Sequence, residues 1–340
     1  MAIDISRGTN ISHWLSQSHA RGEERRNFFT RDDVRRIADW GFDHIRIPVD
    51  EEQMWDERGN REPEAWDLLN AALDWADEAG LKAVVDLHIL RSHYFNAPEE
   101  PRLYQDPEEV RKFVHLWEQI SEQLSSRPVE KVAYELLNEP VARDPEAWNT
   151  LFHGLIEAIR RREAERTIVV GSNDFQQPKT FPQLRLPEDP NCLLSFHFYY
   201  PMYVTHNQAS WWGPSRYYAQ DVQYPGMPIP EAEYEKLGDE AKDVVTAQGL
   251  NRHYNRDAMT DEIEPVLEAR ETSGLGLYCG EFGCVSNTPD EIRKRWYGDI
   301  VGVLEANGIA WANWDYKGKL FGLLGPDGEE TGVAQMLLGR

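Results

Sequence analysis

Two glutamates stand directly after short apolar segments of the chain. Glu139 lies in the stretch LLNEP at residues 136–140, and Glu281 lies in GEFG at residues 280–283. Most of the 59 acidic residues are expected to be solvated surface charges. Two carboxyl groups that end buried strands can instead face one another across a substrate. That arrangement cleaves glycosidic bonds, with one group as general acid and the other as nucleophile or base.

Further polar and aromatic residues follow other apolar segments of the sequence. Arginine, histidine, asparagine and tyrosine side chains can orient sugar hydroxyls or tune a neighbouring carboxyl, and the flat face of tryptophan suits a pyranose ring. The candidates of this kind are Arg46, His88, Asn138, His197, Tyr199, Trp314, Trp14, Trp211 and Trp212. We expect them to gather with the two glutamates if the segments they follow end on one side of the molecule.

Eight short apolar runs rich in β-forming residues alternate with longer amphipathic stretches. The runs cover residues 5–10, 44–49, 82–87, 132–137, 167–171, 193–198, 276–280 and 308–313. The amphipathic stretches cover residues 31–40, 64–79, 107–124, 145–162, 255–271 and 290–306. This alternation predicts an α/β fold, a (β/α)8 TIM barrel, in which reactive residues cluster at the carboxyl ends of the strands.

The chain carries no Ser/Gly-rich linker and no break in composition, so we predict a single catalytic domain over residues 1–340. The length exceeds the roughly 250 residues of a typical barrel of this kind. The extra residues lie mainly between Tyr199 and Asn255, a stretch rich in Tyr, Trp, Pro and Gly. We expect this stretch to be a long insertion after strand six that lies over the mouth of the barrel.

At these residues the chain resembles glycoside hydrolase family 5, the cellulase-type family of retaining (β/α)8-barrel enzymes. The LLNEP stretch is similar to the acid/base motif of the family, and GEFG is similar to its nucleophile motif. The histidine and tyrosine of His197-x-Tyr199 fall between the two in the expected order. The resemblance implies Glu139 as acid/base, Glu281 as nucleophile, and a separation of about 5–5.5 Å between their carboxyl groups.

The resemblance also implies roles for the surrounding polar residues. Arg46 would keep Glu281 ionised, because a neighbouring cation favours the charged form of a carboxyl group. Tyr199 would donate a hydrogen bond to the same carboxylate. Asn138 would bind the 2-hydroxyl of the reacting sugar, a contact that strengthens in the transition state.

Two histidines and several tryptophans complete the site that the resemblance implies. His88 and His197 would orient the reacting sugar and the acid, and Trp314 would form the floor on which that sugar stacks. Trp14 and the pair at 211–212 would extend the row of aromatic rings, which favours a cleft for several equatorially linked sugars. The alternative for the pair at 211–212 is that it pins a long loop to the barrel.

The substrate favoured by these features is a β-1,4-glucan cleaved within the chain, as by an endoglucanase. A β-mannanase, a mixed-linkage glucanase and an exo-acting β-glucosidase are alternatives, because neither glutamate motif specifies the sugar. A carbohydrate-binding protein on a retired enzyme scaffold belongs to a different class. The presence of both glutamates and of all the supporting residues argues against it.

Composition excludes several other kinds of partner. The net charge of −23 disfavours a nucleic-acid partner, and no apolar run approaches the roughly 20 residues of a membrane span. Three irregularly spaced cysteines form neither a disulfide framework nor a zinc site, and no motif implies a cofactor or a metal. The first residues do not resemble a signal peptide, so we expect a cytoplasmic protein, or an extracellular one if a leader has been removed.

Overall fold

The computed structural model describes residues 2–97 and 99–339. Eight parallel strands form a closed barrel in sequence order. They are β1 (Arg7–Asn10), β2 (His44–Asp50), β3 (Lys82–Ile89), β4 (Val132–Glu135), β5 (Ile168–Gly171), β6 (Cys192–Phe198), β7 (Gly276–Phe282) and β8 (Ala310–Asn313). The barrel closes where β1 pairs with β8, and the predicted (β/α)8 fold is confirmed.

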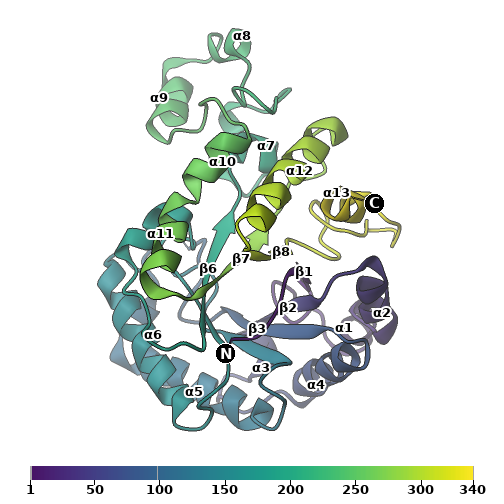
Figure 1. Ribbon diagram of the computed structural model, residues 1–340, viewed down its shortest axis with the longest axis vertical. Coiled ribbons are helices and arrows are strands. Elements are labelled where there is room, and N and C mark those ends of the chain that lie inside the picture. The colour runs from purple at the N-terminus through teal and green to yellow at the C-terminus, as the bar shows by residue number, and fades with distance from the viewer. Residues whose placement is uncertain (1, 98, 340) are drawn as a thin grey trace. The chain divides into compact units, whose positions relative to one another are not determined.

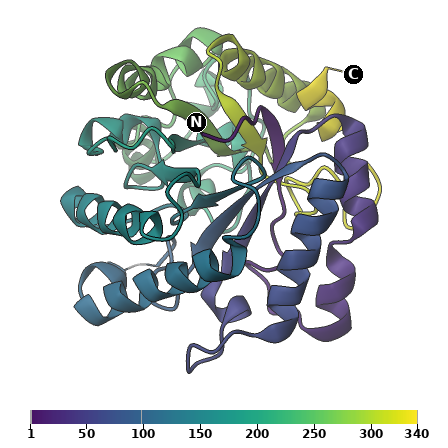
Figure 2. The same ribbon diagram turned by 60° about the horizontal axis from the view of Figure 1, so that its bottom comes forward.

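The helices alternate with the strands (Figures 1 and 2). They are α1 (Gly22–Phe28), α2 (Arg31–Trp40), α3 (Glu51–Met54), α4 (Pro63–Glu78), α5 (Pro107–Leu124), α6 (Pro145–Arg160), α7 (Met202–Thr205), α8 (Glu231–Tyr234), α9 (Asp239–Ala247), α10 (Arg256–Glu262), α11 (Glu264–Ser273), α12 (Asp290–Ala306) and α13 (Val333–Leu338). Short 3-10 turns are η1 (Arg102–Tyr104), η2 (Pro178–Gln183) and η3 (Gly213–Tyr217).

Local sequence explains where the long helices begin and end. Thr30 and Asp33 form a reciprocal capping box at the start of α2. Asp106 and Asp144 cap α5 and α6, each followed by a proline in the first turn, where its missing N–H costs nothing. The single helix predicted over 255–271 is wrong: the chain forms α10 and α11 instead, because Pro265 cannot donate the hydrogen bond that a continuous helix requires.

The interior of the barrel is layered. One buried cluster takes a residue from each of six strands, namely Val84, Ala133, Val169, Leu193, Tyr278 and Ala312. Side chains alternate between the two faces of a strand, so the residue two positions further along faces the interior again. Asp86, Glu135 and Ser195 occupy such positions and are fully buried. A polar layer therefore lies directly above the apolar one.

The chain divides into two compact units, which are described separately below. The first comprises the residues up to His197 together with Pro265–Glu281 and Ile309–Asn313, and it holds almost all of the barrel strands. The second comprises Phe198–Glu264, Phe282–Gly308 and the residues from Trp314 onward. The prediction of a single domain over residues 1–340 stays a prediction.

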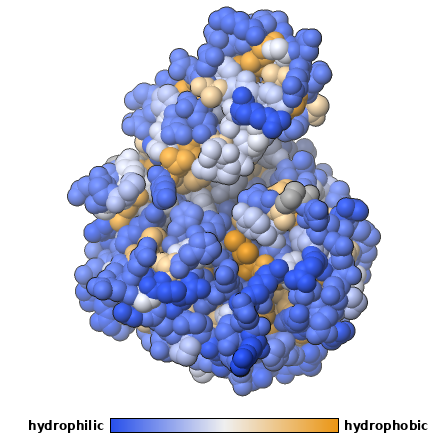
Figure 3. All heavy atoms as spheres, turned by 180° about the vertical axis from the view of Figure 1, so that it is seen from behind, coloured by the Kyte–Doolittle hydropathy of each residue, from blue (hydrophilic) through white to orange (hydrophobic). Residues whose placement is uncertain are grey.

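The face drawn in Figure 3 is mostly hydrophilic, with apolar residues in small patches. Among the described residues, none of the helices combines the length and the apolar character that crossing a lipid bilayer requires.

Gly8 provides a test of the packing inside the barrel. A Cβ atom at Gly8 would lie 2.4 Å from Nε2 of the His44 ring, which is held between Asp43 (2.6 Å) and the hydroxyl of Tyr278 (3.2 Å). The His44 ring is buried, and both of its nitrogens are in hydrogen-bond contact, so it cannot move aside without losing a contact. Gly8→Ala should therefore lower the free energy of unfolding by about 1–3 kcal/mol in urea denaturation.

The matched control for that variant is Gly154→Ala. Gly154 is exposed within α6, and a Cβ atom there meets nothing within 4 Å. This substitution should leave stability unchanged or raise it by up to about 1 kcal/mol, because alanine is the better helix former. Equal stability of Gly8→Ala and wild type would contradict the packing described for His44.

Candidate active site

A single buried arginine holds the acidic groups of the barrel together. The guanidinium of Arg46, on β2, lies 2.7 Å from Oε1 of Glu281 through Nη1. Its Nε and Nη2 atoms donate to the two carboxylate oxygens of Glu135, at 2.6 and 3.1 Å. Nη2 also lies 3.0 Å from Oδ2 of Asp86. Arg46, Asp86 and Glu135 are fully buried, so one cation is shared among three carboxyl groups from β3, β4 and β7.

Two asparagines complete the contacts of this guanidinium. Asn10 accepts a hydrogen bond from Nη1 of Arg46 at 2.9 Å, and Asn138 accepts one from Nη2 at 3.0 Å. Asn10 also donates to the backbone carbonyls of Gly280 and Asn313, at 2.9 and 3.1 Å. The arginine therefore has an acceptor for each of its donor atoms, and its orientation is fixed from β1, β4 and β7.

The two sequence-predicted glutamates meet beside His197. Nδ1 of His197, on β6, lies 2.9 Å from Oε1 of Glu139 and 3.7 Å from Oε2 of Glu281. One oxygen of each carboxyl group and a ring nitrogen of His197 all lie within 4.8 Å of one another. Glu139 has a φ of 44°, in the left-handed region, because the chain turns sharply after β4. The structure therefore brings together the pair that the motifs predicted.

Burial and charge make the two glutamates chemically different. Burial raises the pKa of Glu139 well above its usual range, and the charge of Glu281 raises it further, against the lowering effect of Arg46. Glu281 lies in direct contact with Arg46, at 2.7 Å, while Glu139 contacts the imidazole. Burial and the positive charge of Arg46 lower the pKa of His197 well below its usual value. The neutral imidazole therefore adds no cation beside Glu139, and the surroundings of the Glu139 carboxyl favour its protonated form.

A second histidine is held by Asp86. Nδ1 of His88 lies 2.7 Å from Oδ2 of Asp86, and its Nε2 lies 3.1 Å from the amide nitrogen of Gln17. Burial lowers the pKa of His88 to about 4, so its ring is neutral at neutral pH. A ring that accepts from the Gln17 amide at Nε2 donates from Nδ1 to Asp86, and this fixes both the tautomer and the orientation of His88.

Sequence analysis missed the acidic and amide residues below the rim, namely Asp86, Glu135, Gln176, Gln17 and Asn10. Asp86 lies within β3 and Glu135 is the last residue of β4, but in the sequence both stand inside the apolar runs at 82–87 and 132–137. The signal that could have found them is the period of two, because each stands two residues after a member of the apolar layer. Charged residues at inward positions of a barrel strand are costly unless they are paired.

Glu139, His197 and Glu281 carry donor atoms of the kinds that metal ions bind. Two carboxylates and an imidazole within 4.8 Å could hold a divalent cation by geometry alone. The guanidinium of Arg46 already lies 2.7 Å from Glu281, however, and a second cation there would be repelled. The arrangement fits an arginine-bound carboxylate better than a metal ligand.

Trp14 lies in the packing around α1. Its indole N–H donates to the carbonyl of Arg25 at 2.8 Å, and its ring contacts Phe29 with centroids 5.2 Å apart. The side chain is 1% exposed, which leaves no open ring face for a sugar. The structure thus places Trp14 outside the carboxylate cluster, contrary to the expected row of sugar-binding rings.

The other aromatic candidates belong to the second unit. Trp211 is 54% exposed, and its ring lies 6.3 Å from those of His206 and Phe321. Trp212 contacts Tyr203 at 4.9 Å. These rings form an aromatic cluster within the unit that also includes Tyr199 and Trp314, which pack near Phe321. The roles expected for Tyr199, Trp211, Trp212 and Trp314 stay predictions.

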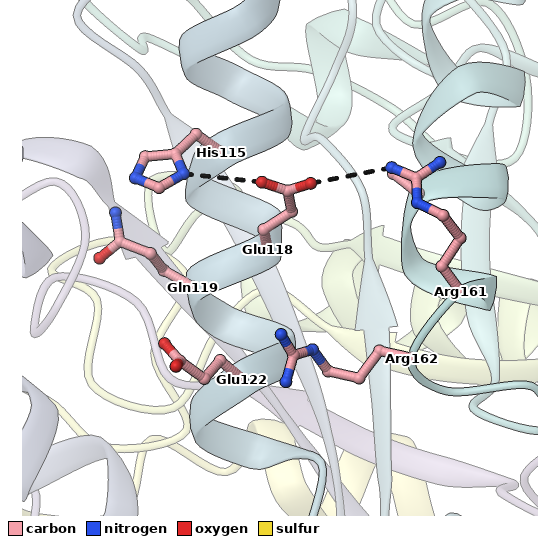
Figure 4. Close-up of a pocket in the computed structure, with 7 residues that line it drawn as sticks. His115, Glu118, Gln119, Glu122, Arg161 and Arg162 are labelled. Carbon is pink, nitrogen blue, oxygen red and sulfur yellow. Dashed lines mark ion pairs between the residues drawn. The ribbon is translucent and has the colours of Figure 1, made fainter.

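A hollow of about 540 Å³ lies on the outer wall of the first unit, between α5 and α6. In Figure 4, Glu118 lies between His115 and Arg161, with ion-pair distances of 3.6 and 3.7 Å. These side chains are largely exposed and mutually neutralising, as on an ordinary helical surface. The hollow shares no residue with the carboxylate cluster.

Paired carboxyl groups near the strand ends of a (β/α)8 barrel are typical of glycoside hydrolases. Residues 7–320 match the cellulase family, glycosyl hydrolase family 5. The chain belongs to this family, which confirms the resemblance inferred from the motifs. The protein is therefore a glycoside hydrolase.

Characterised relatives span nearly the whole chain. It is similar to Endoglucanase C of Acetivibrio thermocellus, with 30% identity over 318 residues, covering 93% of this chain and 92% of that protein. It is also similar to Cellodextrinase A of Ruminococcus flavefaciens, with 28% identity over 90% of this chain and 84% of that protein. Thermotoga maritima Cel5A in complex with cellobiose shares the fold, with a TM-score of 0.77 and 22% identity over 98% of this chain and 96% of its own.

Asp86 offers a test of the buried charge cluster. Burial raises the pKa of Asp86 to about 7, despite the opposing effect of Arg46, whereas an unfolded aspartate has a pKa of about 3.9. At Asp86, folding therefore takes up a proton between these pH values, and the contribution of this group to the free energy of unfolding should fall as pH rises from about 4 to 7. In urea denaturation, the stability of Asp86→Asn relative to wild type should rise over this range, because the variant lacks this contribution.

The matched control is Asp67→Asn, on the exposed face of α4. It should keep the wild-type dependence of stability on pH. If the difference in stability between Asp86→Asn and wild type were the same at pH 4 and at pH 7, Asp86 would not be the group that takes up this proton.

Proposed function

We propose that the protein is a retaining endo-β-1,4-glucanase in which Glu281 is the nucleophile and Glu139 is the acid/base. One observation carries this proposal: oxygens of the two carboxyl groups lie within 4.8 Å, with His197 between them. Inverting enzymes need about 6.5–9.5 Å between their carboxyl groups to hold a water molecule, whereas retaining enzymes need about 5–5.5 Å. The observed separation supports direct attack by a side chain.

The different surroundings of the two carboxyl groups support the assignment of roles. The guanidinium of Arg46 stabilises the anion of Glu281, which attacks the anomeric carbon of the sugar. Burial and the nearby charge of Glu281 raise the pKa of Glu139, which favours its protonated form. It donates that proton to the departing glycosidic oxygen, so bond breaking produces a neutral alcohol.

The second half of the reaction reverses the role of Glu139. When Glu281 forms an ester with the sugar, its negative charge is consumed, and one of the causes that raise the pKa of Glu139 is lost. Glu139 then accepts a proton from water, which attacks the anomeric carbon and releases Glu281. Two inversions give net retention of configuration.

Two buried nitrogen atoms support a sugar site beside the carboxyl pair. Nδ2 of Asn138 and Nε2 of His197 are buried and make no hydrogen bond within the described part of the chain. A buried polar atom without a partner is costly unless a ligand or water satisfies it. We assign Nδ2 of Asn138 to the sugar 2-hydroxyl, where its contact strengthens as positive charge develops on the ring.

The substrate assignment rests on the relatives and on the aromatic cluster of the second unit. Endoglucanase C is 30% identical to this chain, and Cel5A structures contain cellobiose or mannotriose. Trp211, 54% exposed, offers an open ring face of the kind on which pyranose rings stack. We propose that residues 199–255 are an insertion after β6 that supplies such platforms, which favours a chain of several sugars over a single terminal one.

A panel of soluble substrates tests the proposal. On carboxymethylcellulose the protein should lower viscosity much faster than it releases reducing ends, as internal cleavage requires. Activity should be lower on mannan and on aryl β-glucosides. Activity confined to an aryl β-glucoside would overturn the endo assignment, and a preference for mannan would overturn the sugar assignment.

Glu139→Gln is the control for that panel. It keeps the size of the side chain but cannot supply a proton, and general acid catalysis contributes about 10²–10⁴-fold. The variant should therefore lose activity on carboxymethylcellulose by a factor in this range while folding normally by circular dichroism. An undiminished rate would remove Glu139 from the reaction.

A further inference from the structure

The turn that follows β5 has an unusual backbone. Asp174, Phe175 and Gln176 have φ values of 58°, 62° and 52°, so three successive residues other than glycine lie in the left-handed region. Side chains disfavour this region, and it persists only where the surrounding structure imposes it. Such conformations cluster at functional sites. The contacts made by Gln176 show what this turn achieves.

The side-chain amide of Gln176 is buried and contacts the main chain of Glu139. Its Oε1 accepts a hydrogen bond from the backbone N–H of Glu139 at 2.8 Å. Its Nε2 donates to Oγ of Ser195 at 3.2 Å and to Oε1 of Glu135 at 3.3 Å. Exchanging the oxygen and nitrogen would set a donor against the N–H of Glu139, so these contacts fix the amide in one orientation.

The backbone of Gln176 holds the histidine that contacts Glu139. The carbonyl of Gln176 accepts a hydrogen bond from the N–H of His197 at 2.9 Å. One residue therefore anchors the main chain of both Glu139 and His197, whose side chains meet at 2.9 Å. Phe175 adds a third link, since its N–H donates to the carbonyl of Pro140 at 3.3 Å.

Gly171 makes room for this arrangement. A Cβ atom at Gly171, the last residue of β5, would lie 2.1 Å from Nε2 and 2.3 Å from Cγ of Gln176. Gly171 is not among the residues with positive φ, so its own backbone does not require glycine. The absence of a side chain is what allows Gln176 to pass over the end of the strand.

We propose that Gln176 is a positioning residue for general acid catalysis by Glu139, an inference that rests on the proposed function. By holding the main chain of Glu139 and His197 from one point, it sets the place from which the carboxyl delivers its proton. Proton transfer depends steeply on distance and alignment. Loss of the Gln176 amide should therefore slow the reactions that need a proton from Glu139. It should leave unchanged the reactions whose leaving group departs without that proton.

Aryl β-cellobiosides with different leaving groups test this directly. Phenol is a poor leaving group that needs the proton, whereas 2,4-dinitrophenolate departs without it. For Gln176→Leu, kcat/KM on the phenyl substrate should fall about 10²-fold, near the lower end of the contribution of a general acid, and change less than about threefold on the dinitrophenyl substrate. A variant that is merely destabilised would lose activity equally on both.

Two further variants complete the experiment. Gly171→Ala keeps Gln176 but displaces its side chain, and should show the same selective loss, which keeps the inference testable if Gln176→Leu does not fold. Gln177→Leu removes the neighbouring amide, whose nitrogen donates to the carbonyl and the carboxylate of Asp174, and should behave as wild type. Equal losses on both substrates, or no loss, for the first two variants would overturn the inference.

A crystal structure of Gln176→Leu gives a readout that does not depend on activity. The inference predicts that the distance from Nδ1 of His197 to Oε1 of Glu139 lengthens beyond hydrogen-bonding range, and an unchanged 2.9 Å would overturn it. Failure of the proposed function looks different: wild-type protein would cleave none of the aryl cellobiosides, whatever the structure of the variant shows.

Discussion

The organisation of the site depends on one buried guanidinium. Arg46 is fully buried and lies within 3.1 Å of carboxylate oxygens of Asp86, Glu135 and Glu281. Burying one cation among several acids is costly, and it is tolerated because every donor atom of the guanidinium has a partner. The raised pKa values of Asp86 and Glu135 follow from this burial. The positive charge of Arg46 acts directly on Glu281, the glutamate at the end of β7 that it contacts.

The barrel gives different surroundings to Glu139 and Glu281, two identical side chains that must act as acid and as nucleophile. Glu139 follows β4 and Glu281 lies at the end of β7, but Glu281 contacts the guanidinium whereas Glu139 contacts a neutral imidazole. One carboxyl group therefore meets a fixed positive charge, while burial raises the pKa of the other and favours its protonated form. Both surroundings are built from the first unit, because Arg46, His197 and both glutamates all belong to it.

The sequence predicted the parts of this site that follow apolar runs, and it missed the acidic residues inside those runs. Glu139 and Glu281 stood out because each follows an apolar run, whereas Asp86 and Glu135 read as members of such runs. Gln176 could not be predicted, since its role depends on a left-handed turn and on the empty space above Gly171. Trp14 was expected among the sugar-binding rings because it follows the first strand. Its position in the sequence does not reveal that its ring packs against α1 instead.

The central claim is that Glu281 attacks the sugar. A 2-deoxy-2-fluoro-β-cellobioside with a dinitrophenyl leaving group should trap the covalent intermediate, because fluorine destabilises the positively charged transition state of its hydrolysis. After proteolysis, mass spectrometry should locate one fluorocellobiosyl group on the peptide that contains Glu281. A label on the peptide that contains Glu139, or no label on protein that cleaves the parent cellobioside, would contradict the account.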